Sequence, residues 1–141
     1  MSKIPSDLLS GWDVVVIDDE PDSLEVARYI LDFYGANVLT ATNGQEGIAL
    51  VQETKPHFVI SDLSMPEMDG WEFVSALKST VQMQDTPVIA LTAHAMRGDR
   101  ERAIAAGFHN YLTKPLTANT FMDELLTLLL DIPQLSDHLT I

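Results

Sequence analysis

The chain has 141 residues, of which 46% are hydrophobic, enough for one domain with a single buried core. Its net charge of −13 argues against a nucleic-acid partner or an anionic membrane, because binding to both depends on Lys and Arg. There is no cysteine, no long apolar segment and no signal-like start, so we expect no disulfide, no membrane contact and a cytoplasmic location.

Apolar strand-like runs alternate with stretches of helical periodicity, a pattern typical of a parallel sheet flanked by helices. Strands are predicted at residues 14–17, 37–41, 58–61, 88–91 and 110–113, and helices at 21–34, 43–54, 70–80, 97–106 and 117–131. Pro21 suits the first turn of the first helix, Asn43 can cap the second, and Gly107 can end the fourth. These five pairs fill residues 13–131, the one predicted domain. Residues 1–12 form an N-terminal extension and 132–141 a tail, each too short to be an output domain.

Reactive polar residues stand where the apolar runs end. Asp18 and Asp19 follow the first run, Asp62 the third and Thr92 the fourth, while Lys114 follows the short fifth run. The carboxyl ends of parallel strands line one crevice in which ligands bind. The sequence therefore predicts three carboxylates, a hydroxyl and an ammonium in one place.

Crowded carboxylates need a compensating charge, and Mg²⁺ is the natural one because it takes oxygen ligands and is often held by only one or two carboxylates. A carboxylate can then act as a nucleophile toward phosphorus. The cation, Lys114 and the Thr92 hydroxyl would stabilise the charge on the transferred oxygens. The pattern indicates phosphoryl transfer to an aspartate.

These residues resemble the receiver domain of two-component response regulators, and the match covers most of the chain. The segment 61–70, SDLSMPEMDG, is similar to the phosphorylation loop of that family. Asp18 and Asp19 resemble the acidic metal pair of that family, and Asp62 resembles its phosphoacceptor. Thr92 resembles the switch hydroxyl and Tyr111 the switch aromatic, while Lys114 with Pro115 resembles the lysine-proline step.

The resemblance implies a flavodoxin-like, doubly wound α/β fold with five parallel strands in the order 2-1-3-4-5 and five helices. It implies Mg²⁺ (or Mn²⁺) bound directly by Asp19 and Asp62, by the carbonyl of Ser64, and by Asp18 through water. The phosphoryl group would come from a histidine kinase or a phosphotransfer protein, and the output would be an altered surface for a downstream effector. The chain would be a signalling receiver that assists only its own phosphorylation and dephosphorylation, not an enzyme.

Phosphorylation would draw the Thr92 hydroxyl and Lys114 toward the phosphoryl group and vacate space for Tyr111. A cis bond before Pro115 would aim the ammonium into the crevice. Ser64 and His94, two residues beyond the phosphoacceptor and the switch threonine, are expected to influence how easily water reaches the group.

Two alternatives belong to other classes. A phosphatase of the haloacid dehalogenase type also forms an aspartyl-phosphate, but its nucleophile lies on the first strand with a second Asp two residues later, where this chain has Glu20 or Pro21. A flavin- or nucleotide-binding module would need a glycine- or hydroxyl-rich loop after the first strand, and the acidic run there would repel phosphate unless a metal intervened.

The fifth helix has more apolar residues than one buried stripe requires. Its sheet-facing set is Phe121, Leu125, Leu128, Leu129 and Ile132. A second stripe, Met122, Leu126 and Leu130, lies on a neighbouring face that a monomer would leave at least partly exposed, and we expect it to mediate self-association or partner docking. The alternative is that the tail folds back and covers this stripe with Leu135 and Leu139.

Overall fold

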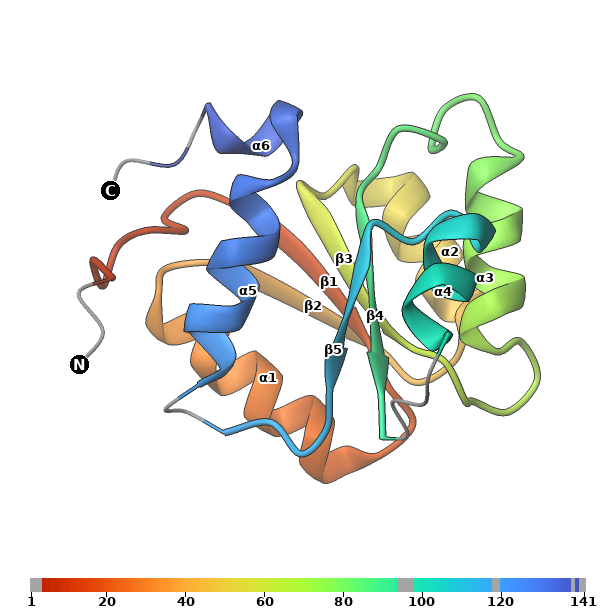
Figure 1. The fold of residues 1–141 in the computed structure, drawn as a ribbon, viewed down its shortest axis with the longest axis horizontal. Coiled ribbons are helices and arrows are strands. Elements are labelled where there is room, and N and C mark those ends of the chain that lie inside the picture. The colour runs from red at the N-terminus through yellow and green to blue at the C-terminus, as the bar shows by residue number, and fades with distance from the viewer. Residues whose placement is uncertain (1–3, 94–97, 118–119, 138, 140–141) are drawn as a thin grey trace.

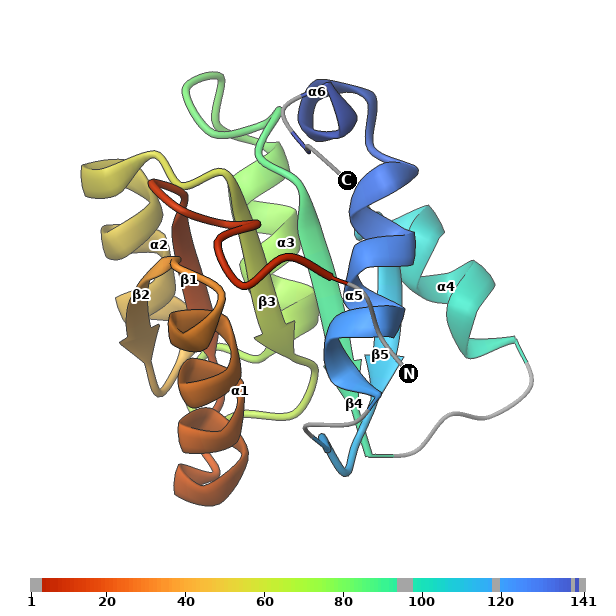
Figure 2. The ribbon, with the colours of Figure 1, turned by 90° about the vertical axis from the view of Figure 1, so that its left-hand side faces the viewer.

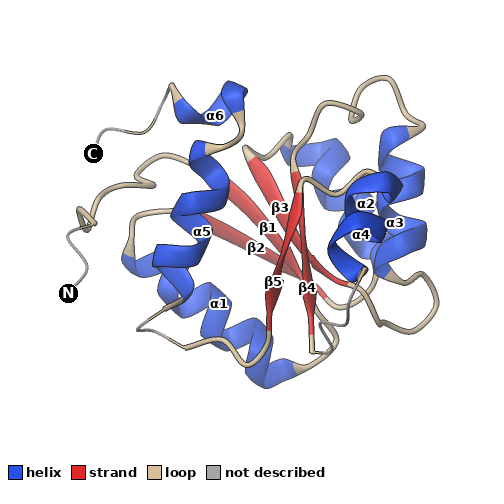
Figure 3. Cartoon of the chain, in the orientation of Figure 1, coloured by secondary structure: helices blue, strands red, loops and turns tan. Residues whose placement is uncertain are grey.

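The predicted alternation of strands and helices produces one parallel sheet between two layers of helices. The computed structural model describes residues 4–93, 98–117, 120–137 and 139. The strand order is β2-β1-β3-β4-β5 and every pairing is parallel, as predicted (Figure 3). The strands are β1 (Asp13–Ile17), β2 (Asn37–Ala41), β3 (Phe58–Asp62), β4 (Val88–Thr92) and β5 (Asn110–Thr113).

The helices divide between the two faces of the sheet. Helices α1 and α5 cover one face, while α2, α3 and α4 cover the other (Figure 1). The helices are α1 (Pro21–Phe33), α2 (Gly44–Thr54), α3 (Gly70–Lys78), α4 (Asp99–Ala106), α5 (Phe121–Leu130) and α6 (Pro133–Ser136). The short α6 was not among the five predicted helices. Among the described residues, no helix combines the length and apolarity needed to span a bilayer.

Local helix signals are confirmed where the deciding contact lies within a few residues. The Asn43 side chain accepts a hydrogen bond from the Glu46 N–H at 2.9 Å and caps α2. Asp69 and Glu72 form a reciprocal capping box at the start of α3. Gly107 ends α4 with a φ of 119°, which a glycine adopts without strain.

Two predicted helix ends are wrong by two residues or more, and a third lies outside the described residues. Helix α3 ends at Lys78, not at residue 80. Just after this end, the hydroxyls of Ser79 and Thr80 donate hydrogen bonds to backbone carbonyl oxygens of the last helical turn. Helix α4 begins at Asp99 because Gly98 has a φ of 90°, outside the helical region; the predicted start at residue 97 lies outside the described residues. Helix α5 begins at Phe121, not at Thr117, which lies outside the helix and whose carbonyl oxygen accepts a hydrogen bond from the Phe121 N–H at 2.9 Å.

The core has two parts, one on each face of the sheet, because side chains alternate along a strand. In β1, Val14 and Val16 face α1 and α5, whereas Val15 and Ile17 face α2 and α3. Strands β3 and β4 are buried along their whole length. The central strands are thus fixed from both sides, which gives the side chains at their carboxyl ends a rigid support.

The segments that flank the predicted domain pack onto its α1 and α5 side. Leu8, Leu9 and Trp12 of the N-terminal segment are buried, and Leu135 of α6 is buried in the same cluster. The Leu9 N–H donates to the carbonyl oxygen of Tyr34, just after α1, at 2.9 Å. Figure 2 shows the N-terminal segment crossing this side of the molecule.

The two tryptophans lie on opposite faces of the sheet. Trp12 stacks on His57, with ring centroids 5.0 Å apart and an interplanar angle of 16°. Trp71, on α3, packs edge-on against Phe108. The guanidinium of Arg102, on α4, lies over the Trp71 ring at 5.2 Å from its centroid, a cation–π contact. Each indole therefore joins two segments that are distant in sequence.

The apolar residues of α5 are more buried than expected. The sheet-facing set is confirmed, with Phe121, Leu125, Leu129 and Ile132 buried and Leu128 half-buried. Met122 is only 3% exposed, so its predicted exposure is wrong; Leu126 is half-buried and Leu130 is 43% exposed. The flanking segments widen the core here, since Leu135 belongs to the same cluster and Leu139 packs against it. The tail thus packs onto the core, as in the alternative, but Leu130 stays exposed, so the tail does not cover the whole stripe.

Candidate functional site

The carboxyl ends of four strands bring most of the predicted site residues together. Asp18 directly follows β1, Asp62 ends β3, Thr92 ends β4 and Lys114 directly follows β5. The parallel register aligns these ends, with Asp62 beside Leu91 and Thr92 beside Thr113. A hollow of about 280 Å³ opens there, lined by Asp19, Glu20, Asp62, Leu63, Ser64, Thr92, Ala93 and Lys114.

Lys114 is the centre of the charge arrangement. Its ammonium nitrogen lies 3.0 Å from Asp18 Oδ2 and 3.2 Å from Asp62 Oδ2, and it also contacts Glu20 Oε1. The Lys114 side chain is 7% exposed, and the bond between Lys114 and Pro115 is cis. The cis bond was predicted from the sequence and is confirmed.

Burial governs the protonation of the acidic groups. It raises the pKa of Asp18 from 3.8 to about 6, and the negative charge of Asp62 adds to this effect. The Glu20 N–H and the Lys114 ammonium bond to Asp18 and offset part of the rise. Burial alone would lower the pKa of Lys114, but its bonds to Glu20 and Asp18 raise that pKa above the ordinary value, so the ammonium stays charged at neutral pH.

Asp62 is held in place by its own loop. Its Oδ1 accepts a hydrogen bond from the Ser64 N–H at 3.3 Å. Gly70 opens α3 directly against the end of β3, where an added Cβ would lie 2.2 Å from the carbonyl oxygen of Asp62. Only glycine allows this approach, which fixes the backbone under the candidate nucleophile.

The donor set fits a hard divalent cation. Oxygen atoms of Asp18, Glu20 and Asp62 lie within 4.8 Å of one another. Asp18 Oδ2 is buried without a hydrogen bond, although it lies 3.0 Å from the Lys114 nitrogen. Mg²⁺ prefers oxygen ligands and is commonly held by one or two carboxylates, so this set of carboxylates fits it. Asp19 and Ser64 line the same hollow and are exposed; their roles as ligands stay predictions.

Glu20 is the site residue that the sequence prediction missed. It is 61% exposed at its side chain, and it reaches Lys114 from the residue that precedes α1. The hydrogen bond from Lys114 lowers its pKa, so Glu20 is ionised at neutral pH. Its position directly after Asp18 and Asp19 at a strand end was the available signal.

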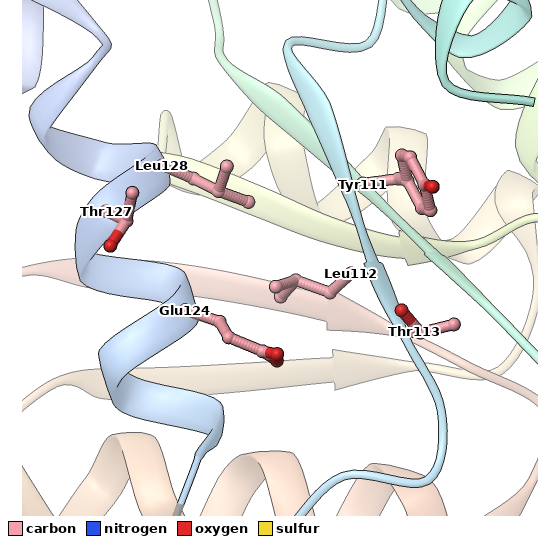
Figure 4. A pocket seen from close by; sticks show the side chains of 6 residues that line it. All are labelled: Tyr111, Leu112, Thr113, Glu124, Thr127 and Leu128. Carbon is pink, nitrogen blue, oxygen red and sulfur yellow. The ribbon is translucent and has the colours of Figure 1, made fainter. Parts of the chain in front are cut away.

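Tyr111 lies apart from this hollow. It is half-buried on β5 and lines a second hollow of about 270 Å³ with Leu112, Thr113, Glu124, Thr127 and Leu128. In Figure 4, Leu112 and Leu128 point toward one another, whereas the Tyr111 ring points away from α5. Residues 94–97, which include His94, lie outside the described residues, so the predicted influence of His94 stays a prediction.

Comparison with known proteins decides the family. The model of the response regulator receiver domain matches residues 14–126. The chain belongs to this family. The receiver is 31% identical to the polar-differentiation response regulator DivK of Brucella anthropi over 110 residues, 78% of this chain and 89% of that protein. It is 40% identical over 108 residues to an uncharacterized 14.6 kDa protein of Leptolyngbya boryana, covering 77% and 82% of the two chains.

Solved receiver structures agree with the fold. The chemotaxis response regulator CheY4 of Vibrio cholerae is 30% identical, with a TM-score of 0.78 over 84% of this chain and 98% of that chain. The receiver domain of a histidine kinase from Syntrophus aciditrophicus is 29% identical, with a TM-score of 0.74 over 86% and 92%. The matches give no support to a haloacid-dehalogenase-like phosphatase.

Membership carries general properties of the family. Receivers are domains of two-component signalling, not enzymes that turn over a free substrate. They bind Mg²⁺ at an acidic pocket, and they interact with histidine kinases or phosphotransfer proteins and with effectors. The acidic cluster at the strand ends agrees with these properties.

Proposed function

We propose that this receiver accepts a phosphoryl group on Asp62, in a reaction that depends on Mg²⁺ or Mn²⁺, and thereby changes a protein-interaction surface. The observation that carries the proposal is the position of Asp62 at the end of β3, with an oxygen 3.2 Å from the Lys114 ammonium in a hollow open to solvent. The acyl phosphate would form where a cation and an ammonium can stabilise it.

The proposed transfer is an in-line displacement. An Asp62 oxygen attacks the phosphorus of a phosphohistidine; the O–P bond forms as the P–N bond breaks, and the bonding pair leaves on the imidazole nitrogen, which takes a proton from water. The cation would be held by Asp19, Asp62 and the Ser64 carbonyl, with Asp18 acting through water, and it supplies neutralisation of phosphoryl charge. Lys114 binds one phosphoryl oxygen directly.

The proposed switch follows from the added charge. Phosphorylation adds negative charge and acceptor oxygens, and the Lys114 ammonium and the Thr92 hydroxyl are the donors at the strand ends that can satisfy them. Movement of Thr92 would make room for Tyr111, which packs on the face of the sheet that carries α4. The surface formed by α4, β5 and α5 would then change.

The partners follow from the family, and their identities stay open. The donor would be a histidine kinase or a phosphotransfer protein of the cytoplasm, and residues 13–131 would form the receiver unit. Docking of an effector or of a second copy on α5 now depends on Leu130 and the half-buried Leu126, because Met122 is part of the core. The receiver would assist only its own phosphorylation and dephosphorylation.

Mass spectrometry after incubation with acetyl phosphate and Mg²⁺ tests the proposal. The wild type is expected to gain one phosphoryl group, and Asp62→Asn none. Asp22→Asn removes an exposed carboxylate on α1 and is the matched control; it is expected to label as the wild type does. Labelling of Asp62→Asn at the wild-type rate would overturn the assignment.

A further inference from the structure

We propose that Glu20 competes with the incoming phosphoryl group for Lys114, and so sets the concentration of small phosphodonor that the receiver needs; this inference rests on the proposed function. Three carboxylates share the Lys114 ammonium: Asp18, Asp62 and Glu20. A phosphoryl oxygen that binds Lys114 must take the place of at least one of them. Which carboxylate leaves is decided by burial.

Asp18 and Asp62 are poorly suited to leave. Their side chains are 0% and 8% exposed, so losing Lys114 would leave a buried carboxylate without its counter-ion. Asp18 is also fixed, because its Oδ1 accepts the Glu20 N–H at 2.9 Å. Asp62 must stay beside Lys114 as the attacking group. Glu20 alone, with a side chain 61% exposed, can turn into water at little cost.

The position of Glu20 also indicates a role at the site instead of a helix-capping role. It is the N-cap residue of α1, yet its side chain makes no capping hydrogen bond to the backbone N–H groups of the first turn. The carboxylate contacts Lys114, which is 94 residues away in sequence, and it also accepts a hydrogen bond from the side chain of Ser23. The Glu20 N–H donates a hydrogen bond to Asp18 Oδ1, which fixes the backbone from which the Glu20 side chain reaches Lys114.

Glu20 therefore has two effects on an anionic donor. Its carboxylate pairs with the Lys114 ammonium that would bind a phosphoryl oxygen, and it adds a negative charge to the rim of the hollow. Both effects weaken donor binding before the chemical step, whereas the attack by Asp62 does not involve Glu20. The concentration of donor that gives half-maximal rate is thus the quantity that Glu20 controls, not the rate at saturation.

Phosphorylation kinetics with acetyl phosphate at saturating Mg²⁺ test the inference. Glu20→Gln is expected to lower the half-saturating donor concentration about two- to fivefold, the range typical of exposed ion pairs, with the rate at saturation unchanged. Glu20→Asp keeps the charge but shortens the side chain that reaches Lys114, and it is also expected to lower the half-saturating donor concentration. Asp22→Asn makes the same charge change without a contact to Lys114 and is expected to match the wild type.

Mg²⁺ titration of the unphosphorylated variants supplies a readout independent of phosphorylation. Glu20→Gln is expected to bind Mg²⁺ within about threefold of the wild type, because Glu20 is paired with Lys114 and the proposed ligands are Asp19, Asp62 and Ser64; a loss of tenfold or more would identify Glu20 as a metal ligand and overturn the inference. Equal half-saturating concentrations in the wild type and Glu20→Gln would also overturn it while leaving the proposed function standing. If the wild type gains no phosphoryl group, the proposed function fails and this inference fails with it.

Discussion

Neutralising Asp18 is expected to stabilise the metal-free receiver at neutral pH. Asp18→Asn keeps an oxygen that can accept the Glu20 N–H but removes a charge that is fully buried. Folding raises the pKa of Asp18 to about 6, so the folded protein favours the protonated carboxyl. That contribution to stability is complete below the unfolded value of 3.8 and is lost as the pH rises through about 6.

The magnitude follows from the two values. Each pH unit between 3.8 and about 6 changes the free energy of unfolding by about 1.36 kcal/mol, which gives up to about 3 kcal/mol in total. The Asp18 side chain is 0% exposed, so solvent screening reduces this figure little. Lys114 keeps Asp62 and Glu20 as partners in the variant, so no unpaired ammonium offsets the gain.

Urea unfolding in the presence of EDTA, followed by circular dichroism from pH 4 to pH 8, measures the difference. Asp18→Asn should be close to the wild type in stability near pH 4 and more stable by up to about 3 kcal/mol above pH 7. Asp22→Asn, an exposed change of equal charge, should stay within about 0.5 kcal/mol of the wild type. A stability difference that does not change with pH, or an Asp18→Asn protein that is less stable at pH 7, would refute the reasoning.

Three further perturbations test other parts of the structure. Gly70→Ala should lower the free energy of unfolding by about 2 kcal/mol and slow labelling, since its Cβ would meet the Asp62 carbonyl oxygen at 2.2 Å; wild-type stability in urea would contradict this. Leu9→Ala should cost about 2–5 kcal/mol in thermal unfolding, because Leu9 is fully buried, and a loss below about 1 kcal/mol would show that its segment adds little to the core. Leu130→Glu should weaken self-association in sedimentation without affecting labelling; a wild type that is monomeric at every concentration, phosphorylated or not, would count against that surface.

The strand ends could be predicted because their signals are short-range. Each apolar run identifies a buried strand, and parallel topology then places the residue after it at a known edge. Asp18, Asp62, Thr92 and Lys114 meet there for this reason alone. The cap at Asn43 was likewise predictable, because its partner lies three residues away.

The missed features depend on contacts between distant parts of the chain. Glu20 looks like an exposed acid before a helix, and only the return of Lys114 from the far edge of the sheet makes it part of the site. Met122 lies on a face of α5 that was expected to be partly exposed, but it is 3% exposed and belongs to the same core cluster as residues of the flanking segments. Periodicity identifies the faces of a helix, but it does not say how many of them the rest of the chain covers.

The arrangement of the two tryptophans makes this receiver suitable for fluorescence spectroscopy without added labels. Trp12 stacks on an imidazole beneath the α1 and α5 layer, and Trp71 lies under a guanidinium between α3 and α4, on the opposite face. Trp12→Phe and Trp71→Phe would each leave one emitter next to a different polar neighbour. Emission from the first variant would report events on the α3 and α4 side, and emission from the second would report the seating of the N-terminal segment, so each face can be observed separately in the same molecule.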